Sequence, residues 1–439
     1  MGTSSSELVV PFLGAIQAAF SVLLTIFYGV LTAQFNLLSV DAAKEVSKTS
    51  VRMFLPALLI YKIGSELHQG TALRYVPILL WAIIYNLVSM ALGIVATRTL
   101  KLPNWVTPAL AFNNTTSLPL LLIQSLEQAG ILDAILTEGD STSSAVSRAE
   151  SYFLINSMVS NSLTFALGPR LLRPSDEDAP NKAKESEDES DGEDEDAENG
   201  AHENPEQALG NVIDEETSLL PARAVRKANR AGRAGYKEGS RRWEQLPPWT
   251  QQTLDVLYSF ANAPLIGAVV GAVIGLVPPL HRLFFNKSDQ GGYLNAWLTT
   301  SIQNIGELFA SLQIIVVGVK LSLSLRKMKR GEASGDMSWT SVAFITVVRF
   351  FLWPLISIPV IWALASKTSV LDADPILWFT MMLMPTGPPA MLLVALADVN
   401  GNSEVEKMAI AKFLTISYAI TPLICFAVVG SLKASQAAM

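Results

Sequence analysis

Residues 106–126 read VTPALAFNNTTSLPLLLIQSL, a hydrophobic run with a polar patch in its middle. Five consecutive side chains of this patch can form hydrogen bonds: Asn113, Asn114, Thr115, Thr116 and Ser117. Unpaired polar groups are costly in hydrocarbon, so the patch must face protein or water. Pro119 lacks a backbone donor and clashes with the preceding helical turn. The pattern predicts a membrane helix that breaks in mid-span.

A second interruption lies in residues 375–397, which read PILWFTMMLMPTGPPAMLLVALA. Its helix-breaking and polar residues are consecutive: Pro385, Thr386, Gly387, Pro388 and Pro389. No regular helix continues through such a stretch. The ends of half-helices carry partial charges, and their amide ends can hold an anionic head group. Paired interruptions in two halves of a chain indicate the binding site of a transporter.

The remaining hydrophobic windows indicate a polytopic membrane protein. A transmembrane helix needs about 20 mostly apolar residues. Ten windows of this kind occur, at residues 8–33, 47–63, 75–96, 106–126, 152–172, 257–280, 299–321, 341–363, 375–397 and 408–432. The predicted fold class is therefore all-α, with about ten transmembrane helices. Five windows lie on each side of a polar segment, and an odd-numbered unit inserts its two copies in opposite senses. We expect two inverted five-helix repeats, in residues 1–172 and 251–439.

Residues 173–250 form the polar segment between the halves. Its part from 176 to 216 holds 18 acidic residues and two lysines, a composition that predicts disorder. Lysine and arginine in short loops are more frequent on the side of the membrane that holds this segment. The positive-inside rule therefore places the loop in the cytoplasm. An acidic dileucine pattern at Glu215, Leu219 and Leu220 predicts a signal for a sorting adaptor.

Ionisable side chains inside spans are costly and mark functional candidates. Glu307 lies in the seventh window and Arg349 near the centre of the eighth. The two could form an ion pair between neighbouring helices, or Glu307 could take part in proton coupling. Lys62 lies near the end of a span, so we expect its ammonium group to extend to the interface.

Other chemistry finds little support in the sequence. One cysteine, Cys425, excludes an internal disulfide framework. No phosphate-binding loop, zinc motif or Ser/His/Asp set is present. We expect no enzymatic activity, no cofactor, no bound metal and no nucleic-acid partner.

Three stretches resemble the auxin efflux carrier family, in the fungal branch nearest the plant PIN-likes proteins. They are NNTTSLPLLL at 113–122, DPILWFTMMLMPTGPPAMLLVALADVNG at 374–401 and KMAIAKFLTISYAITPL at 407–423. The resemblance implies a scaffold domain and a transport domain, with spans four and nine crossing at their breaks. It also implies elevator-like transport of auxin-like indole carboxylates or other organic anions, often by homodimers. On this resemblance Asn113, Asn114 and Pro119 form one side of the crossover, and Pro385, Pro388 and Pro389 form the other.

These observations together predict a secondary transporter of a small organic anion in the lipid bilayer. A sodium-coupled symporter of the same fold is one alternative. Another is a membrane scaffold or sensor that does not transport and acts through its acidic loop. The resemblance favours the endoplasmic reticulum membrane, whereas the dileucine pattern favours a vacuolar or endosomal membrane; the plasma membrane is a further alternative.

Overall fold

The computed structural model describes residues 5–68, 70–172, 247, 250, 254, 262–330, 338–399 and 404–439. Nearly all of the acidic loop, including the predicted sorting residues Glu215, Leu219 and Leu220, lies outside these ranges. The longer helices are α1 (Ser5–Gln34), α2 (Val40–Thr49), α3 (Leu55–Glu66), α4 (Ala72–Thr99), α5 (Val106–Ala111), α6 (Ser117–Gln128), α7 (Thr142–Leu171), α10 (Ala263–Leu276), α11 (Pro278–Phe285), α12 (Thr300–Lys329), α13 (Trp339–Val347), α14 (Trp353–Lys367), α15 (Pro375–Leu383), α16 (Leu392–Val399), α17 (Glu404–Ala419) and α18 (Ile424–Ala438). Short 3₁₀ or π turns occur at Ser50–Phe54, Leu132–Ile135, Ser288–Gln290, Asn295–Thr299, Val348–Leu352 and Thr421–Leu423.

Four of the described helical segments are long and apolar enough to cross a membrane. They are Val9–Gln34, Ala72–Thr99, Asn295–Leu323 and Trp339–Lys367. Two bent helix pairs raise the number to six if each pair is one span. The molecule is thus mostly helical with four to six candidate spans, and the ten-span arrangement stays a prediction.

The predicted window 257–280 is not one straight helix where the structure describes it. Helix α10 ends at Leu276, and α11 leaves at an angle of 101°. Pro278 and Pro279 explain the bend, because proline is tolerated in the first turn of a new helix but not within an existing one. The last window bends as well, by 47°, next to the turn that contains Pro422.

Apolar side chains cover the outer faces of several helices. On α4 the exposed ones include Leu73, Val76, Leu80, Ile83, Ile84, Leu87, Val88 and Val95. The opposite face of α4 is buried and includes Tyr85 and Asn86. A helix that is apolar outside and partly polar inside is suited to lipid, which cannot hydrate polar groups.

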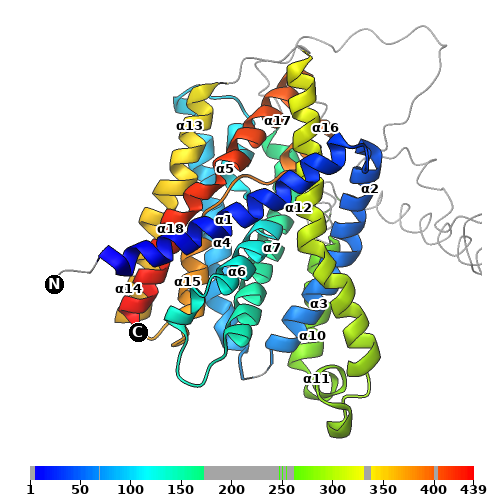
Figure 1. Cartoon of the computed structure of the whole chain (residues 1–439), viewed down its shortest axis with the longest axis vertical. Helices are drawn as coiled ribbons and strands as arrows, with labels where there is room; N and C mark the ends of the chain where they lie inside the picture. Colours follow the sequence, from blue (N-terminus) through cyan, green and yellow to red (C-terminus); the bar gives the residue numbers. More distant parts are fainter. Residues whose placement is uncertain are drawn as a thin grey trace, which may run out of the picture. The chain divides into compact units, whose positions relative to one another are not determined.

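Helix α1 packs along α12, and α3 packs along α10 (Figure 1). The first contact depends on Gly29 and Gly318, where the two backbones meet. A Cβ atom on Gly318 would collide with the carbonyl oxygen of Ile26, and one on Gly29 with that of Ile315. Small residues allow such close approach of membrane helices, where packing drives association.

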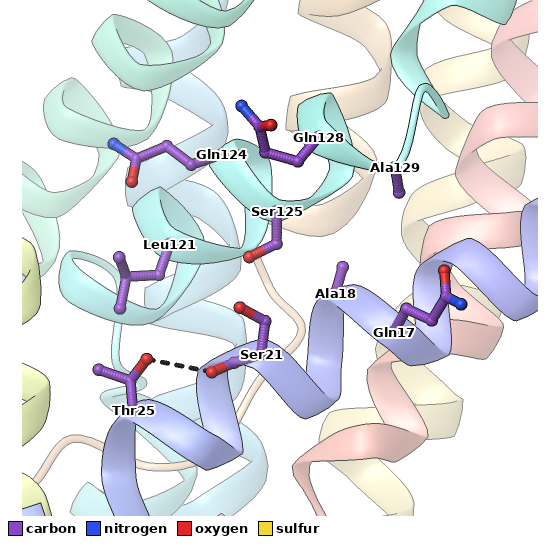
Figure 2. A pocket seen from close by; sticks show the side chains of 9 residues that line it. All are labelled: Gln17, Ala18, Ser21, Thr25, Leu121, Gln124, Ser125, Gln128 and Ala129. Atoms are coloured by element: carbon purple, nitrogen blue, oxygen red, sulfur yellow. Dashed lines mark hydrogen bonds between the residues drawn. The ribbon is translucent and has the colours of Figure 1, made fainter. Parts of the chain in front are cut away.

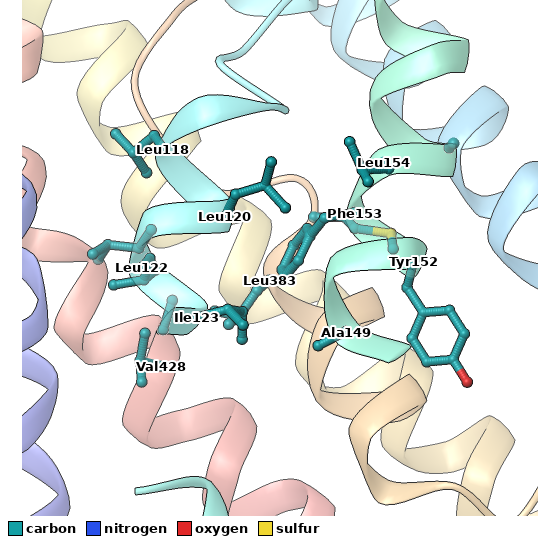
Figure 3. Packing of buried hydrophobic residues seen from close by; sticks show 14 of the residues in the cluster. Leu118, Leu120, Leu122, Ile123, Ala149, Tyr152, Phe153, Leu154, Leu383 and Val428 are labelled. Carbon is teal, nitrogen blue, oxygen red and sulfur yellow. The ribbon is translucent and has the colours of Figure 1, made fainter. Parts of the chain in front are cut away.

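The short helices of the two interrupted segments lie in the interior. All six residues of α5 and all nine of α15 are buried. Around them, leucines and isoleucine of α6 pack near Phe153 of α7, Leu383 of α15 and Val428 of α18 (Figure 3). This core places the interrupted segments at the centre of the helical bundle.

Candidate functional site

The helix of residues 106–126 ends at Ala111, and a new helix begins at Ser117. Residues between them are not helical, and Phe112 is extended. Pro119 lies in the first turn of α6, where its missing N–H leaves no helical bond unmade. The polar patch therefore forms the break itself, and the proline favours the restart.

The second interruption separates α15 from α16. Helix α15 ends at Leu383 and α16 begins at Leu392. Pro385, Pro388 and Pro389 lie between them, and Gly387 has a φ of 135°. Residues with a Cβ atom rarely adopt that backbone conformation, so this position requires glycine.

The two interruptions cross and pair through their backbones. The amide of Asn114 donates to the carbonyl of Pro388 at 2.9 Å, and the amide of Ala390 donates to the carbonyl of Phe112 at 3.0 Å. These bonds make an antiparallel bridge between Asn113 and Pro389. Segments separated by more than 270 residues thus meet as a two-stranded link inside a helical protein.

The two asparagines add side-chain bonds to this crossover. Asn113 Nδ2 donates to the Met384 carbonyl at 2.9 Å. Asn114 Nδ2 donates to the Tyr418 hydroxyl at 2.9 Å, while its Oδ1 accepts from Ser117 Oγ at 3.3 Å. Asn114 therefore links the break to α17 and to the start of α6. Much of the hydrogen-bonding capacity expected to hold a ligand is used to build the crossover.

Other polar atoms of the crossover have no partner among the described residues. They are Asn113 Oδ1, Thr115 Oγ1 and Thr386 Oγ1, all buried. Buried polar groups are usually paired, so these three atoms are candidates for contact with a ligand. Thr116, which also belongs to the polar patch, is only half-buried. On the second segment, the carbonyl of Pro385 accepts a hydrogen bond from Arg349 at 3.3 Å.

No ion pair joins Glu307 and Arg349, although the structure describes both residues. Glu307 is exposed and accepts a 2.7 Å hydrogen bond from Gln303 on its own helix. Arg349 is fully buried and donates to the carbonyls of Pro385 and Ala109. The ion-pair interpretation is therefore wrong, because the arginine points to the crossover and the glutamate to the outside.

A buried ion pair between α3 and α7 has no counterpart in the sequence analysis. Lys62 Nζ lies 2.6 Å from Glu150 Oε2, with the two side chains 14% and 7% exposed. Gln124 of α6 donates to Glu150 Oε1 at 2.8 Å. The expectation that Lys62 extends to the interface is therefore wrong, since a carboxylate inside the bundle holds its ammonium group. Glu150 lies just before the hydrophobic window 152–172, so the sequence does not mark it as an ionisable residue within a span.

Gln124 also lines a groove of about 400 Å³ between α1 and α6. Six of its nine lining residues have polar side chains: Gln17, Ser21, Thr25, Gln124, Ser125 and Gln128. Figure 2 shows Ser125 and Leu121 of α6 directed toward Ser21 and Thr25 of α1. The groove is open at the surface, since Gln17, Ser21, Gln124 and Gln128 are exposed.

Asp374 precedes the N-terminus of α15 and bonds several neighbouring groups there. Its Oδ1 accepts from the amide of Ile376 at 3.1 Å and caps the helix. Its Oδ2 accepts from the Tyr152 hydroxyl at 2.7 Å and lies 3.4 Å from Arg148 Nε and 3.8 Å from Arg74 Nη1. The Asp-Pro pair at the helix start is a sequence signal for this cap. Within the described ranges, no group of His, Cys, Asp and Glu is arranged to hold a metal ion.

Together these features define an α-helical membrane protein whose two interrupted helices cross at a buried polar centre. Residues 15–427 match the family described as Membrane transport protein. The chain belongs to this family, which is that of the auxin efflux carriers. It is a multi-pass membrane protein of a transporter family, and that family is not one of enzymes.

Curated relatives agree with this assignment. The chain is 24% identical over 420 residues to an uncharacterised transporter of Schizosaccharomyces pombe, covering 92% of this chain and 91% of the relative. It is 24% identical over 204 residues to PIN-LIKES 3 of Arabidopsis thaliana, covering 46% and 47% of the two chains. PIN-LIKES 4 of the same plant is 26% identical over 142 residues, 32% of each chain. The similarity to the fungal protein thus spans nearly the full length, and that to the plant proteins spans part of it.

Proposed function

We propose that the chain is a secondary carrier of a small organic anion, such as an indole carboxylate, which binds at the crossover. The observation that carries this proposal is the backbone pairing of two interrupted helices beside unpartnered, buried hydroxyls of Thr115 and Thr386. Both hydroxyls can donate to a carboxylate, and the amide end of α6 begins next to Thr116. Methionine and leucine side chains of α15 offer an apolar surface for the body of the solute.

The proposed architecture is ten crossings in two inverted repeats, residues 1–172 and 251–439, with the loop 173–250 in the cytoplasm. Contacts between helices support it, because they recur in matched pairs. Helix α1 packs on α12 as α10 packs on α3, and α4 packs on α7 as α14 packs on α18. The first and sixth predicted spans therefore have equivalent partners, and so do the third and eighth.

Transport follows an elevator motion in this proposal, with the helices around the crossover sliding past a scaffold that includes α1. The polar groove between α1 and α6 supports such a division, since α1 and α6 face each other partly through polar side chains rather than through apolar packing alone. The resemblance to auxin carriers also suggests a homodimer. Crosslinking in native membranes tests the dimer independently of transport.

A ligand-stabilisation screen tests the site. Purified protein in detergent is heated with indole and aliphatic carboxylates, and active compounds are then followed as uptake into proteoliposomes. Thr115→Val and Thr386→Val remove an unpartnered hydroxyl with little change in volume, so we expect both variants to fold and to bind at least several-fold more weakly.

Thr164→Val is the matched control for these variants. Its hydroxyl is buried but bonds locally to the Ser160 carbonyl at 2.7 Å in α7. We expect its ligand affinity to equal that of the wild type. Wild-type affinity in both crossover variants would remove the site assignment.

Sodium-coupled symport is the alternative within the same fold. Arg349 disfavours it, because the guanidinium already binds carbonyls of Ala109 and Pro385 at the crossover, and such carbonyls are typical sodium ligands. Uptake measured with choline in place of sodium separates the two mechanisms.

A membrane scaffold or sensor would depend on the loop, so deletion of residues 176–216 would remove its phenotype while a carrier keeps its transport.

The endoplasmic reticulum membrane is the proposed location, on the resemblance to PIN-likes proteins. The pattern at Glu215, Leu219 and Leu220 makes a vacuolar or endosomal membrane, reached through a sorting adaptor, the alternative. Fluorescence microscopy of the wild type and of the Leu219→Ala, Leu220→Ala double variant distinguishes them. A change of compartment in that variant supports sorting by the loop.

A further inference from the structure

Arg349 is the largest fully buried side chain described in the protein. It belongs to a π-helical turn, Val348–Leu352, that joins α13 to α14. The extra residue of a π turn redirects side chains, and such turns are frequent at functional sites. Here the turn directs the guanidinium into the centre of the bundle, against the crossover.

The guanidinium contacts both interrupted segments. Nη1 donates to the Pro385 carbonyl at 3.3 Å, and Nη2 donates to the Ala109 carbonyl at 3.4 Å. Both bonds are longer than the usual range for charged donors. The carbonyl of Ala109 lies near the end of α5, and that of Pro385 just beyond the end of α15, where helix dipoles are negative. Arg349 therefore compensates the negative ends of two half-helices at once.

This compensation is incomplete. Among the described residues, no carboxylate lies within 4.0 Å of Arg349, and its Nε has no hydrogen-bond partner. Tyr85 of α4 is the titratable side chain that interacts with it, and the hydroxyl of Tyr85 already donates to Asn156 at 2.8 Å. The two helix ends together supply about one elementary charge, but it is spread over several carbonyls, and the two bonds to them are long for a charged donor. A buried cation without a counter-ion is energetically unfavourable, and an anion that enters the site relieves it.

We propose that Arg349 is the specificity-determining residue that makes the carrier select a singly charged organic anion over a neutral solute. The inference rests on the proposed function, since it names the charge of the solute held at the crossover. A single buried positive charge balances one carboxylate. A dicarboxylate would bring a second negative charge into a centre that, in the described residues, offers hydroxyls and amides beyond this arginine. The carrier therefore prefers monocarboxylates to both amides and dicarboxylates.

Arg349→Gln and Arg349→Lys separate charge from structure. Glutamine keeps a side-chain donor but removes the charge, and lysine keeps the charge but loses the two-armed fork. The probes are indole-3-acetate and its neutral amide, compared by thermal stabilisation in detergent and by uptake into proteoliposomes. We expect the Gln variant to lose the preference for the acid on the order of thirtyfold or more, while the amide binds as in the wild type. The Lys variant keeps most of the preference.

The outcomes are distinguishable. A Gln variant that keeps the wild-type ratio of acid to amide overturns the role of Arg349 and leaves the carrier intact. A wild-type protein that binds amide and acid equally also overturns it. If the Gln variant fails to fold, the Lys variant decides, because loss of the acid preference there would contradict a role based on charge. A wild-type protein that binds none of the carboxylates in the screen instead removes the proposed function.

Discussion

The pair of Lys62 and Glu150 gives the sharpest test of the packing between α3, α6 and α7. Replacing Glu150 by Leu leaves an ammonium group whose side chain is 14% exposed, with Ser147 Oγ at 3.4 Å and the Tyr61 ring centroid at 5.7 Å as its remaining contacts among the described residues. Removing one partner of a buried ion pair costs about 3–5 kcal/mol. The folded-to-unfolded ratio should therefore fall roughly a hundredfold to several thousandfold. Lys62→Met should cost a similar amount, because it leaves the carboxylate unpaired.

The double variant Lys62→Met, Glu150→Leu should recover most of this loss. Two apolar side chains of similar volume can replace a buried pair without penalty. Gln124 still loses the carboxylate that accepts its 2.8 Å bond, so a residual cost of about 1 kcal/mol is expected. The assay is reversible unfolding in mixed detergent micelles, followed by the fluorescence of the nine tryptophans.

The exposed pair of Lys44 and Asp41 is the matched control. Its atoms lie 3.8 Å apart, and its side chains are 70% and 91% exposed. Asp41→Ala should leave the unfolding free energy unchanged within error, since exposed pairs contribute little. The reasoning about Lys62 and Glu150 is refuted if their single variants match this control. Additive losses in the double variant would refute it too.

Three further perturbations test other parts of the structure. Gly318→Ala should destabilise the protein by about 1–3 kcal/mol, because the new methyl group meets the backbone of α1, whereas Gly430→Ala meets only the end of a flexible isoleucine; thermal unfolding compares them. Tyr418→Phe leaves the buried Asn114 amide without its acceptor and should cost about 1–3 kcal/mol in the same assay. Asp140→Asn tests pH dependence. The hydrogen bond from Arg148 lowers the pKa of Asp140 in the folded protein below its ordinary value of 3.8. The charged Asp140 therefore stabilises the fold at pH values above 3.8, and this contribution is lost as the pH falls through the pKa of the folded state. The wild type should therefore exceed this variant in stability at pH 7 and approach it in strong acid, as measured by denaturant unfolding.

Sequence patterns located the two interruptions because proline, glycine and adjacent polar residues act locally on the backbone. The helices end at Ala111 and Leu383, within the windows where the breaks were expected. Helix bends at Pro278 and Pro422 have the same kind of cause, although hydrophobicity alone predicts straight spans there.

Contacts between distant residues were not accessible in the same way. Lys62 and Glu150 are separated by 88 positions, and a hydrophobicity window carries no information about such a pair. The partners of Arg349 are backbone carbonyls, which every residue possesses, so no residue type marks them. The natural assumption that an intramembrane arginine pairs with an intramembrane glutamate failed for this reason.

The link between Asn114 and Pro388 and between Ala390 and Phe112 uses main-chain atoms alone. Side chains at these positions can therefore be exchanged without cutting the connection, except that proline at 114 or 390 would delete a donor. A change of side chain can therefore alter the chemistry of this centre while the two interrupted segments stay hydrogen-bonded to each other. In the proposed carrier, mutations can thus change the selectivity for a solute without breaking the backbone hydrogen bonds that join the two segments.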